Sequence, residues 1–170
     1  MRVLGVDPGL SRCGVGVVEG PVARPRVLRA GVIRTPAGDP VATRLAALHA
    51  ELTALIAAER PDAMAVERVF FNANVRTAMS VGQAAGVALL CAAQAGVPVV
   101  EYTPTQVKSS VAGHGGADKA QVTFMVRALL RLAEAPKPAD AADALALALC
   151  HLQHAPLAAA GGAATPGRNA

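Results

Sequence analysis

The order of its short apolar segments limits the folds open to this chain more than any other feature of its sequence. Residues 2–7, 12–18 and 26–34 have the composition of β-strands, and the turn after the first of them begins Pro8-Gly9. Three strands so close together predict an antiparallel meander. Beyond residue 40, helical segments alternate with further strands at 62–67 and 97–102. We therefore expect an α/β protein with a mixed five-stranded sheet flanked by helices.

The spacing of apolar residues identifies the helices. Between residues 41 and 58 they recur every three to four positions, which gives one stripe that faces the sheet: Leu45, Leu48, Leu52, Leu55 and Ile56. Further helices are expected at 75–95, 104–111, 118–133 and 140–153. Residues 155–170 are of low complexity and cannot bury much apolar surface, so we expect a disordered tail. The predicted organisation is one domain over residues 1–154, followed by this tail.

Composition narrows the class of protein. A chain of 170 residues with 53% hydrophobic residues suits a single domain with a sizeable core. Its longest apolar stretch, 87–100, is broken by Gln94, Gly96 and Pro98, and its N-terminus does not resemble a signal peptide, so we expect a cytoplasmic protein without a membrane segment. The three cysteines lie singly among apolar residues, which favours buried free thiols. A net charge of +4 favours a polyanionic partner.

Four of the twelve acidic residues stand at the ends of apolar segments. Asp7 ends the first strand, Glu67 ends the fourth, and Asp140 and Asp143 lie beside the apolar run 144–149. A right-handed crossover through the first helix would place the fourth strand parallel to the first, with Asp7 and Glu67 side by side. Mg²⁺ prefers carboxylate and water oxygens, and two such ions about 4 Å apart can activate a water for attack on a phosphodiester. The four acids thus indicate a metal-dependent nuclease.

Each acid also has a simpler explanation. Asp7 would suit the start of the Asp-Pro-Gly turn, and Asp140 and Asp143 would suit a helix cap. Glu67 would suit a salt bridge with Arg68 or another arginine. Only their convergence on one cavity would make a site.

Six motifs follow one another along the chain. They are Val6-Asp7-Pro8-Gly9, Val66-Glu67-Arg68-Val69-Phe70-Phe71, Gly82-Gln83-Ala84-Ala85-Gly86, Glu101-Tyr102-Thr103-Pro104-Thr105-Gln106-Val107-Lys108, Ala117-Asp118-Lys119-Ala120-Gln121-Val122 and Ala139-Asp140-Ala141-Ala142-Asp143-Ala144-Leu145-Ala146. In this order, they resemble the RuvC family of bacterial Holliday junction resolvases. The resemblance spans nearly all of residues 1–154. It implies an RNase H-like fold, and paired, symmetric, metal-dependent nicks in four-way DNA junctions during recombination and repair.

The resemblance also implies roles for particular residues. Asp7, Glu67, Asp140 and Asp143 would be the catalytic acids that bind the metal, two Mg²⁺ ions or alternatively Mn²⁺. Lys108 and Lys119 would contact DNA near the cleavage site, and Phe70 would stack against or wedge between junction bases. Arg76 is a further candidate for DNA binding, because it falls near the acids in the expected arrangement.

The expected partners are four-way junction DNA, a second copy of the chain, and the branch-migration helicase formed by RuvA and RuvB. The segment 75–95 supports the homodimer, since apolar residues spread most of the way around the helix it predicts. Another RNase H-like nuclease, of the YqgF type with a different nucleic-acid substrate, remains an alternative. The chain departs from family members at Lys108-Ser109-Ser110, where relatives often have consecutive lysines, and at Ala85, where they often have arginine. Arg68 would either supply a replacement charge or be a surface residue without a role in binding.

Overall fold

The computed structural model describes residues 1–68 and 75–161, and it describes the side chains of 1–68 and 78–155. The strands are β1 (Arg2–Asp7), β2 (Arg12–Glu19), β3 (Arg26–Arg34), β4 (Ala63–Glu67) and β5 (Val99–Tyr102). The helices are α1 (Val41–Glu59), α2 (Val75–Gln94), α3 (Pro104–Ala112), α4 (Lys119–Leu129) and α5 (Ala139–Gly161).

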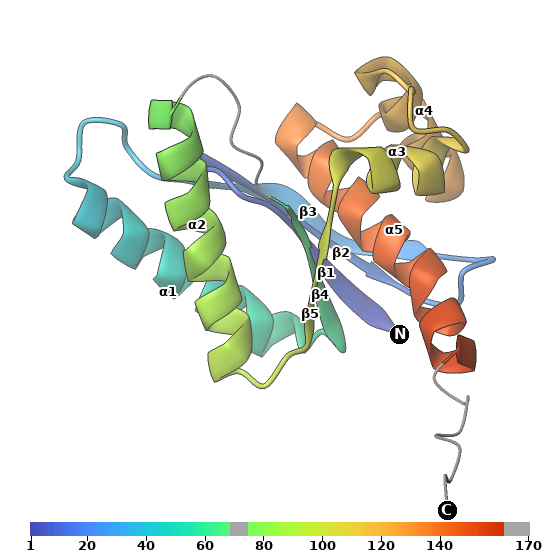
Figure 1. The fold of residues 1–170 in the computed structure, drawn as a ribbon, viewed down its shortest axis with the longest axis horizontal. Coiled ribbons are helices and arrows are strands. Elements are labelled where there is room, and N and C mark those ends of the chain that lie inside the picture. Colours follow the sequence, from blue (N-terminus) through green and yellow to red (C-terminus); the bar gives the residue numbers. More distant parts are fainter. Residues whose placement is uncertain (69–74, 162–170) are drawn as a thin grey trace, which may run out of the picture.

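The strands form one mixed sheet in the order β3-β2-β1-β4-β5 (Figure 1). Neighbouring strands are antiparallel from β3 to β1 and parallel from β1 to β5. The expected mixed five-stranded sheet is therefore confirmed. So is the parallel pairing of β1 with β4, which follows from the crossover through α1.

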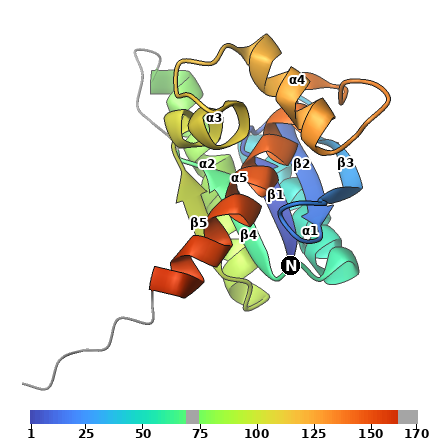
Figure 2. The ribbon, with the colours of Figure 1, turned by 90° about the vertical axis from the view of Figure 1, so that its right-hand side faces the viewer.

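Helices cover both faces of the sheet, with α1 and α2 on one face and α3, α4 and α5 on the other (Figures 1 and 2). Alternate residues of a strand point to opposite faces, and β1 shows this directly. Leu4 and Val6 pack with Leu48 and Leu52 of α1. Val3 packs in the second core with residues of α5. The result is a three-layer domain with a separate apolar core on each face of the sheet.

Glycines in the central strands bring α5 unusually close to the sheet. A Cβ atom on Gly5 would lie 1.9 Å from the carbonyl oxygen of Ala144, and one on Gly14 would lie 2.1 Å from that of Asp140. Real Cβ atoms do not approach so closely, so a side chain at either position would push the helix away. The N-terminal end of α5 is therefore fixed against β1 and β2.

α5 is longer than the sequence predicts. The expected helix ends at residue 153, with a disordered tail from 155, whereas α5 continues to Gly161. Residues 157–160 are Leu-Ala-Ala-Ala, and alanine and leucine have the highest helix propensities, so low complexity in this segment does not exclude a helix. The helix thus includes residues 155–161, and residues 162–170 lie outside the described residues.

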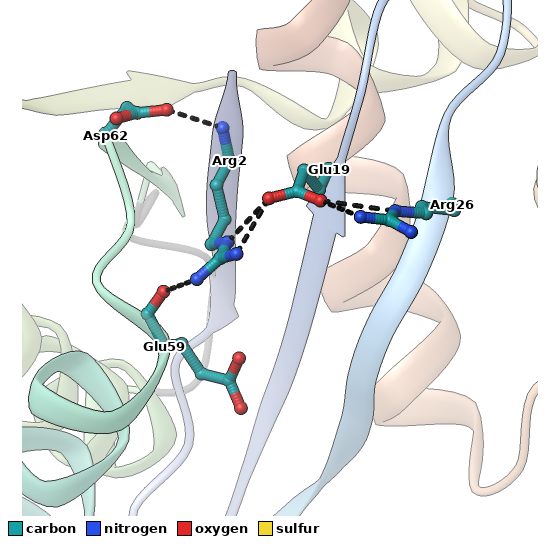
Figure 3. Close-up of polar contacts among 5 residues, drawn as sticks. All are labelled: Arg2, Glu19, Arg26, Glu59 and Asp62. Carbon is teal, nitrogen blue, oxygen red and sulfur yellow. Dashed lines mark hydrogen bonds and ion pairs between the residues drawn. The ribbon is translucent and has the colours of Figure 1, made fainter.

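A charged network fixes the end of the sheet away from α4 (Figure 3). Glu19, the last residue of β2, receives hydrogen bonds from Arg2 at 2.7 and 3.1 Å and from Arg26 at 2.5 and 3.1 Å. The backbone N–H of Arg2 donates to the Asp62 carboxylate at 2.7 Å, and the Arg2 guanidinium donates to the Glu59 carbonyl oxygen. These contacts tie the first strand to its neighbours and to the loop that precedes β4.

Two further expectations concern α1 and the cysteines. Cys13, Cys91 and Cys150 are buried free thiols, as expected. Within the described part of the chain, α1 alone is long and apolar enough to cross a membrane by length and composition, a test that core helices also pass. Its buried residues pack against the sheet and α2 in this structure.

Candidate active site

Asp7 and Glu67 lie next to each other at the carboxyl ends of two parallel strands. The register pairs Val6 of β1 with Val66 of β4, so each acid is the next residue along its strand. Both side chains are partly buried, and among the described residues Glu67 forms no ion pair with Arg68 or any other arginine. The adjacency that the topology predicts is therefore present.

Asp140 and Asp143 reach the same place from α5. The helix begins at Ala139, so neither acid is its N-cap, and the simpler explanation of the pair as a helix cap does not hold. Three positions apart on one helix, they lie on neighbouring parts of its surface. Gly14 allows this end of α5 to lie directly on β2, which brings both acids towards the end of β1.

The helices α3 and α4, which pack on α5, each contribute one lysine. Lys119 is the first residue of α4, whose start is fixed by a capping box between Asp118 and Gln121. Its ammonium group lies 2.7 Å from a carboxylate oxygen of Asp143. Lys108 lies in the middle of α3 and is half-buried. The positions of both lysines thus depend on how α3 and α4 pack against α5.

All six side chains line one cavity of about 490 Å³. Its charged lining consists of Asp7, Glu67, Lys108, Lys119, Asp140 and Asp143. Apolar residues of α3, α4 and α5 complete its wall, including Val107, Val122 and Leu147. The four acids and both lysines that the sequence singles out are thus brought together from five different elements.

The pKa values of Asp7 and Glu67 are raised, as expected for buried carboxylates that lie close together. Burial, followed by the charges of the other three acids, raises the pKa of Asp7 from 3.8 to about 7. Burial and the charge of Asp143 also raise the pKa of Glu67. The pKa of Lys119 is raised, chiefly by its hydrogen bond to Asp143. This part of the cavity therefore favours any added positive charge.

The chemistry of the donors suits a hard divalent cation. Carboxylate oxygens are the ligands that Mg²⁺ and Mn²⁺ prefer, and a cation would offset both the burial and the repulsion that raise the pKa of Asp7. Yet within residues 1–68 and 78–155 no three Asp, Glu, His or Cys side chains are arranged to hold a metal ion. In this structure Asp140 and Asp143 instead form salt bridges, with Arg12 and Lys119 respectively. Carboxylate rotamers adjust more easily than the backbone that carries them, so the four acids can turn towards a cation that enters the cavity.

Three further residues that the sequence singles out are not among the described residues that line this cavity. Phe70 lies outside the described residues, and only the backbone of Arg76 is described, at the start of α2. Arg68 is exposed immediately after Glu67. The sequence analysis did not identify Arg12 as a residue of the site. Its position at the start of the strand after Asp7 could have indicated a basic side chain close to the acids. It forms a salt bridge with Asp140.

The raised pKa of Asp7 predicts that this acid destabilises the folded protein when divalent metal ions are removed. A carboxyl whose folded-state pKa exceeds its unfolded value costs stability as the pH rises from about 4 to about 7, and the full cost remains above that range. In EDTA at pH 8, Asp7→Asn should therefore raise the free energy of unfolding by roughly 2 to 4 kcal/mol, where the upper figure corresponds to the whole rise in the pKa of Asp7. The gain should largely disappear near pH 4. Denaturant unfolding at both pH values measures it.

Asp39→Asn is the control for this prediction, since Asp39 is an exposed acid in the loop before α1. It should leave the free energy of unfolding nearly unchanged. An Asp7→Asn protein no more stable than wild type at pH 8 would contradict the electrostatic account.

Comparison with known proteins shows the same family over almost the whole chain. The family model described as crossover junction endodeoxyribonuclease RuvC matches residues 3–151. The crossover junction endodeoxyribonuclease RuvC of Parafrankia sp. (strain EAN1pec) is 58% identical over 170 residues, which cover 99% of this chain and 96% of the relative. That of Salinispora arenicola (strain CNS-205) is 61% identical over 153 residues, with coverage of 89% and 87%.

A solved structure agrees with these relatives. T. thermophilus RuvC in complex with a Holliday junction substrate superposes with a TM-score of 0.89 at 43% identity, covering 93% of this chain and 96% of that one. These matches favour the resolvase over the YqgF-type nuclease and confirm the RNase H-like fold that the resemblance implied. The chain belongs to the RuvC family of crossover junction endodeoxyribonucleases.

Proposed function

We propose that the protein resolves four-way DNA junctions by paired, symmetric nicks during recombination and repair. The observation that carries this proposal is the convergence of four carboxylates and two lysines on one cavity. The relative from T. thermophilus was solved with a Holliday junction substrate, which supports the same substrate class for this chain.

In the proposed mechanism, Asp7, Glu67, Asp140 and Asp143 would hold two Mg²⁺ ions, with Mn²⁺ as the alternative. When bound, such ions supply an activated water and stabilise the leaving oxygen of the phosphodiester. Asp7 and Glu67 provide a rigid half of the site, because each is fixed at the end of a central strand. Asp140 and Asp143 provide the other half from α5.

The basic residues would act on the DNA. Lys119, at the edge of the cavity, is suited to hold the scissile phosphate or to offset negative charge that develops on it. Lys108 lines the same cavity from α3 and would contact a neighbouring phosphate. From the sequence, we also propose that Phe70 stacks against or wedges between junction bases and that Arg76 contacts a phosphate.

We propose a homodimer that uses α2. The helix exposes the large apolar side chains of Met79 and Leu90, which are 61% and 50% exposed. Eleven residues apart, they lie on the same side of an α-helix. Gly82 and Gly86 lie between them and have open space around them, so a partner helix could approach closely. Two-fold symmetry would place two active sites on opposing strands of a junction.

Membership of the family also supports a complex with the branch-migration helicase formed by RuvA and RuvB, and a cytoplasmic location. Both proposals rest on the family relation.

A panel of substrates tests the proposed function. The wild-type protein, with Mg²⁺, is incubated with a synthetic four-way junction, duplex DNA, single-stranded DNA and an RNA:DNA hybrid. We expect nicks at symmetric positions on two opposing strands of the junction and little cleavage of the other three. Preferential cleavage of the hybrid or of single strands would instead indicate a different RNase H-like nuclease.

A further inference from the structure

Arg12 holds one of the four acids through two hydrogen bonds. Its Nε and Nη2 atoms donate to the same carboxylate oxygen of Asp140, at 3.1 and 2.5 Å. Asp7 and Glu67, which line the same cavity, form no ion pair among the described residues. Asp140 therefore already has a positive partner, which Asp7 and Glu67 lack among the described residues.

The backbone on both sides of this contact is fixed. Arg12 and Gly14 are two residues apart on β2 and point to the same face of the sheet, where Gly14 lies against the backbone of Asp140. The turn before Arg12 is held by the buried side chain of Arg44, which donates to Ser11 at 2.5 Å and to Thr35 at 3.0 Å. The Arg12 guanidinium can therefore leave or reach Asp140 by side-chain rotation, without movement of the main chain.

The contact competes with the metal site proposed above. Both hydrogen bonds occupy one oxygen of Asp140, which leaves that oxygen little capacity to coordinate a cation. The positive charge of Arg12 would also repel a cation that approached the second oxygen. Lys119 holds Asp143 in a similar way, at 2.7 Å, so both acids of α5 are paired with side-chain cations. The acids at the ends of β1 and β4 form no ion pair among the described residues.

We propose that Arg12 is a positioning residue that occupies Asp140 until a divalent cation displaces it, and so weakens metal binding. This inference rests on the proposed metal site. Arg12 turns away from Asp140 when the carboxylate becomes a metal ligand. The affinity of the site for metal is therefore set partly by the ion pair that must first be broken.

The size of the effect follows from the exposure of the pair. The side chains of Arg12 and Asp140 are 41% and 27% exposed, so solvent screens their attraction. Exposed ion pairs are weak, and breaking this one is expected to lower metal affinity by about two- to fivefold. Removing Arg12 should tighten metal binding by the same factor.

The chain offers a matched control at the other end of β2. Arg26 holds Glu19 with the same two atoms and the same distances, 3.1 and 2.5 Å (Figure 3). Glu19 is the last residue of the strand that Arg12 begins, and it keeps Arg2 as a second partner. Arg26→Gln thus removes an arginine and a comparable salt bridge far from the four acids.

The experiment is a calorimetric titration of the full-length protein with Mn²⁺ in the absence of DNA. Arg12→Gln should bind Mn²⁺ about two- to fivefold more tightly than wild type, and Arg26→Gln should match wild type. Arg12→Lys keeps the charge without the paired hydrogen bonds and should fall between wild type and Arg12→Gln. It also serves as the second variant if Arg12→Gln does not fold.

The outcomes separate this inference from the metal site itself. Unchanged or weaker Mn²⁺ binding by Arg12→Gln, or by Arg12→Lys if only that variant folds, overturns the role of Arg12. Equal tightening in Arg26→Gln also overturns it, since the effect would then be one of net charge. If the wild-type protein binds no Mn²⁺, the metal site proposed above fails instead.

Discussion

Asp7→Asn is expected to slow cleavage of a four-way junction by about a thousandfold while leaving junction binding intact. Asp7 lines the cavity from the end of the central strand β1, and asparagine keeps its shape while removing the charge that a divalent cation needs. Losing one charged ligand costs several kcal/mol of transition-state stabilisation, and each 1.4 kcal/mol corresponds to a tenfold change in rate. DNA affinity depends on cations that contact phosphates, and the substitution removes none of these.

Single-turnover cleavage in Mg²⁺ and a gel-shift titration with the junction, both at one salt concentration, measure the two effects. Asp39→Asn removes an exposed acid elsewhere and should cleave at the wild-type rate. Because Asp7→Asn is also expected to be more stable than wild type in EDTA, loss of folding would not explain lost cleavage. Near wild-type cleavage by Asp7→Asn would remove Asp7 from the mechanism.

The second large effect is expected for Lys119→Ala, which should slow cleavage by about tenfold to a hundredfold. The ammonium group sits at the edge of the cavity, 2.7 Å from Asp143, where it would also contact the phosphate that reacts. Its charge would matter most when negative charge develops on that phosphate, so rate should suffer more than affinity. Junction affinity should fall less than about fivefold, as expected for one exposed contact.

Lys137 provides the control for this variant. It is one of only three lysines in the chain, is exposed in the loop before α5, and does not line the cavity. Lys137→Ala should cleave at nearly the wild-type rate, and Lys119→Arg should recover part of the activity. Equal losses of rate and affinity in Lys119→Ala would reassign Lys119 to general phosphate binding.

Local sequence was sufficient to predict most elements of this fold. The β1–β2 hairpin follows from two short apolar strands around a Pro-Gly turn, and α1 follows from its leucine spacing. Such patterns depend on residues close together in the chain, whose periodicity shows in any window. The length of α5 was underestimated because alanine-rich, low-complexity sequence suits both a helix and a disordered tail.

The candidate site was predictable only in part. The adjacency of Asp7 and Glu67 follows from a topological rule, since a helix that joins parallel strands leaves their ends at one edge of the sheet. No such rule pairs Arg12 with Asp140, because those residues are 128 positions apart. Their contact depends on Gly14, which lets α5 rest on β2.

By itself, the sequence determined the order and type of the elements, the acids at their ends and, through its motifs, the family. These are properties of local periodicity and of residue identity, which can be read without coordinates. The tertiary structure decided which charges pair with which acids, and how far burial raises the pKa of Asp7. Electrostatic effects depend on distance and on the exclusion of water, and both are set only when α5 packs against the sheet.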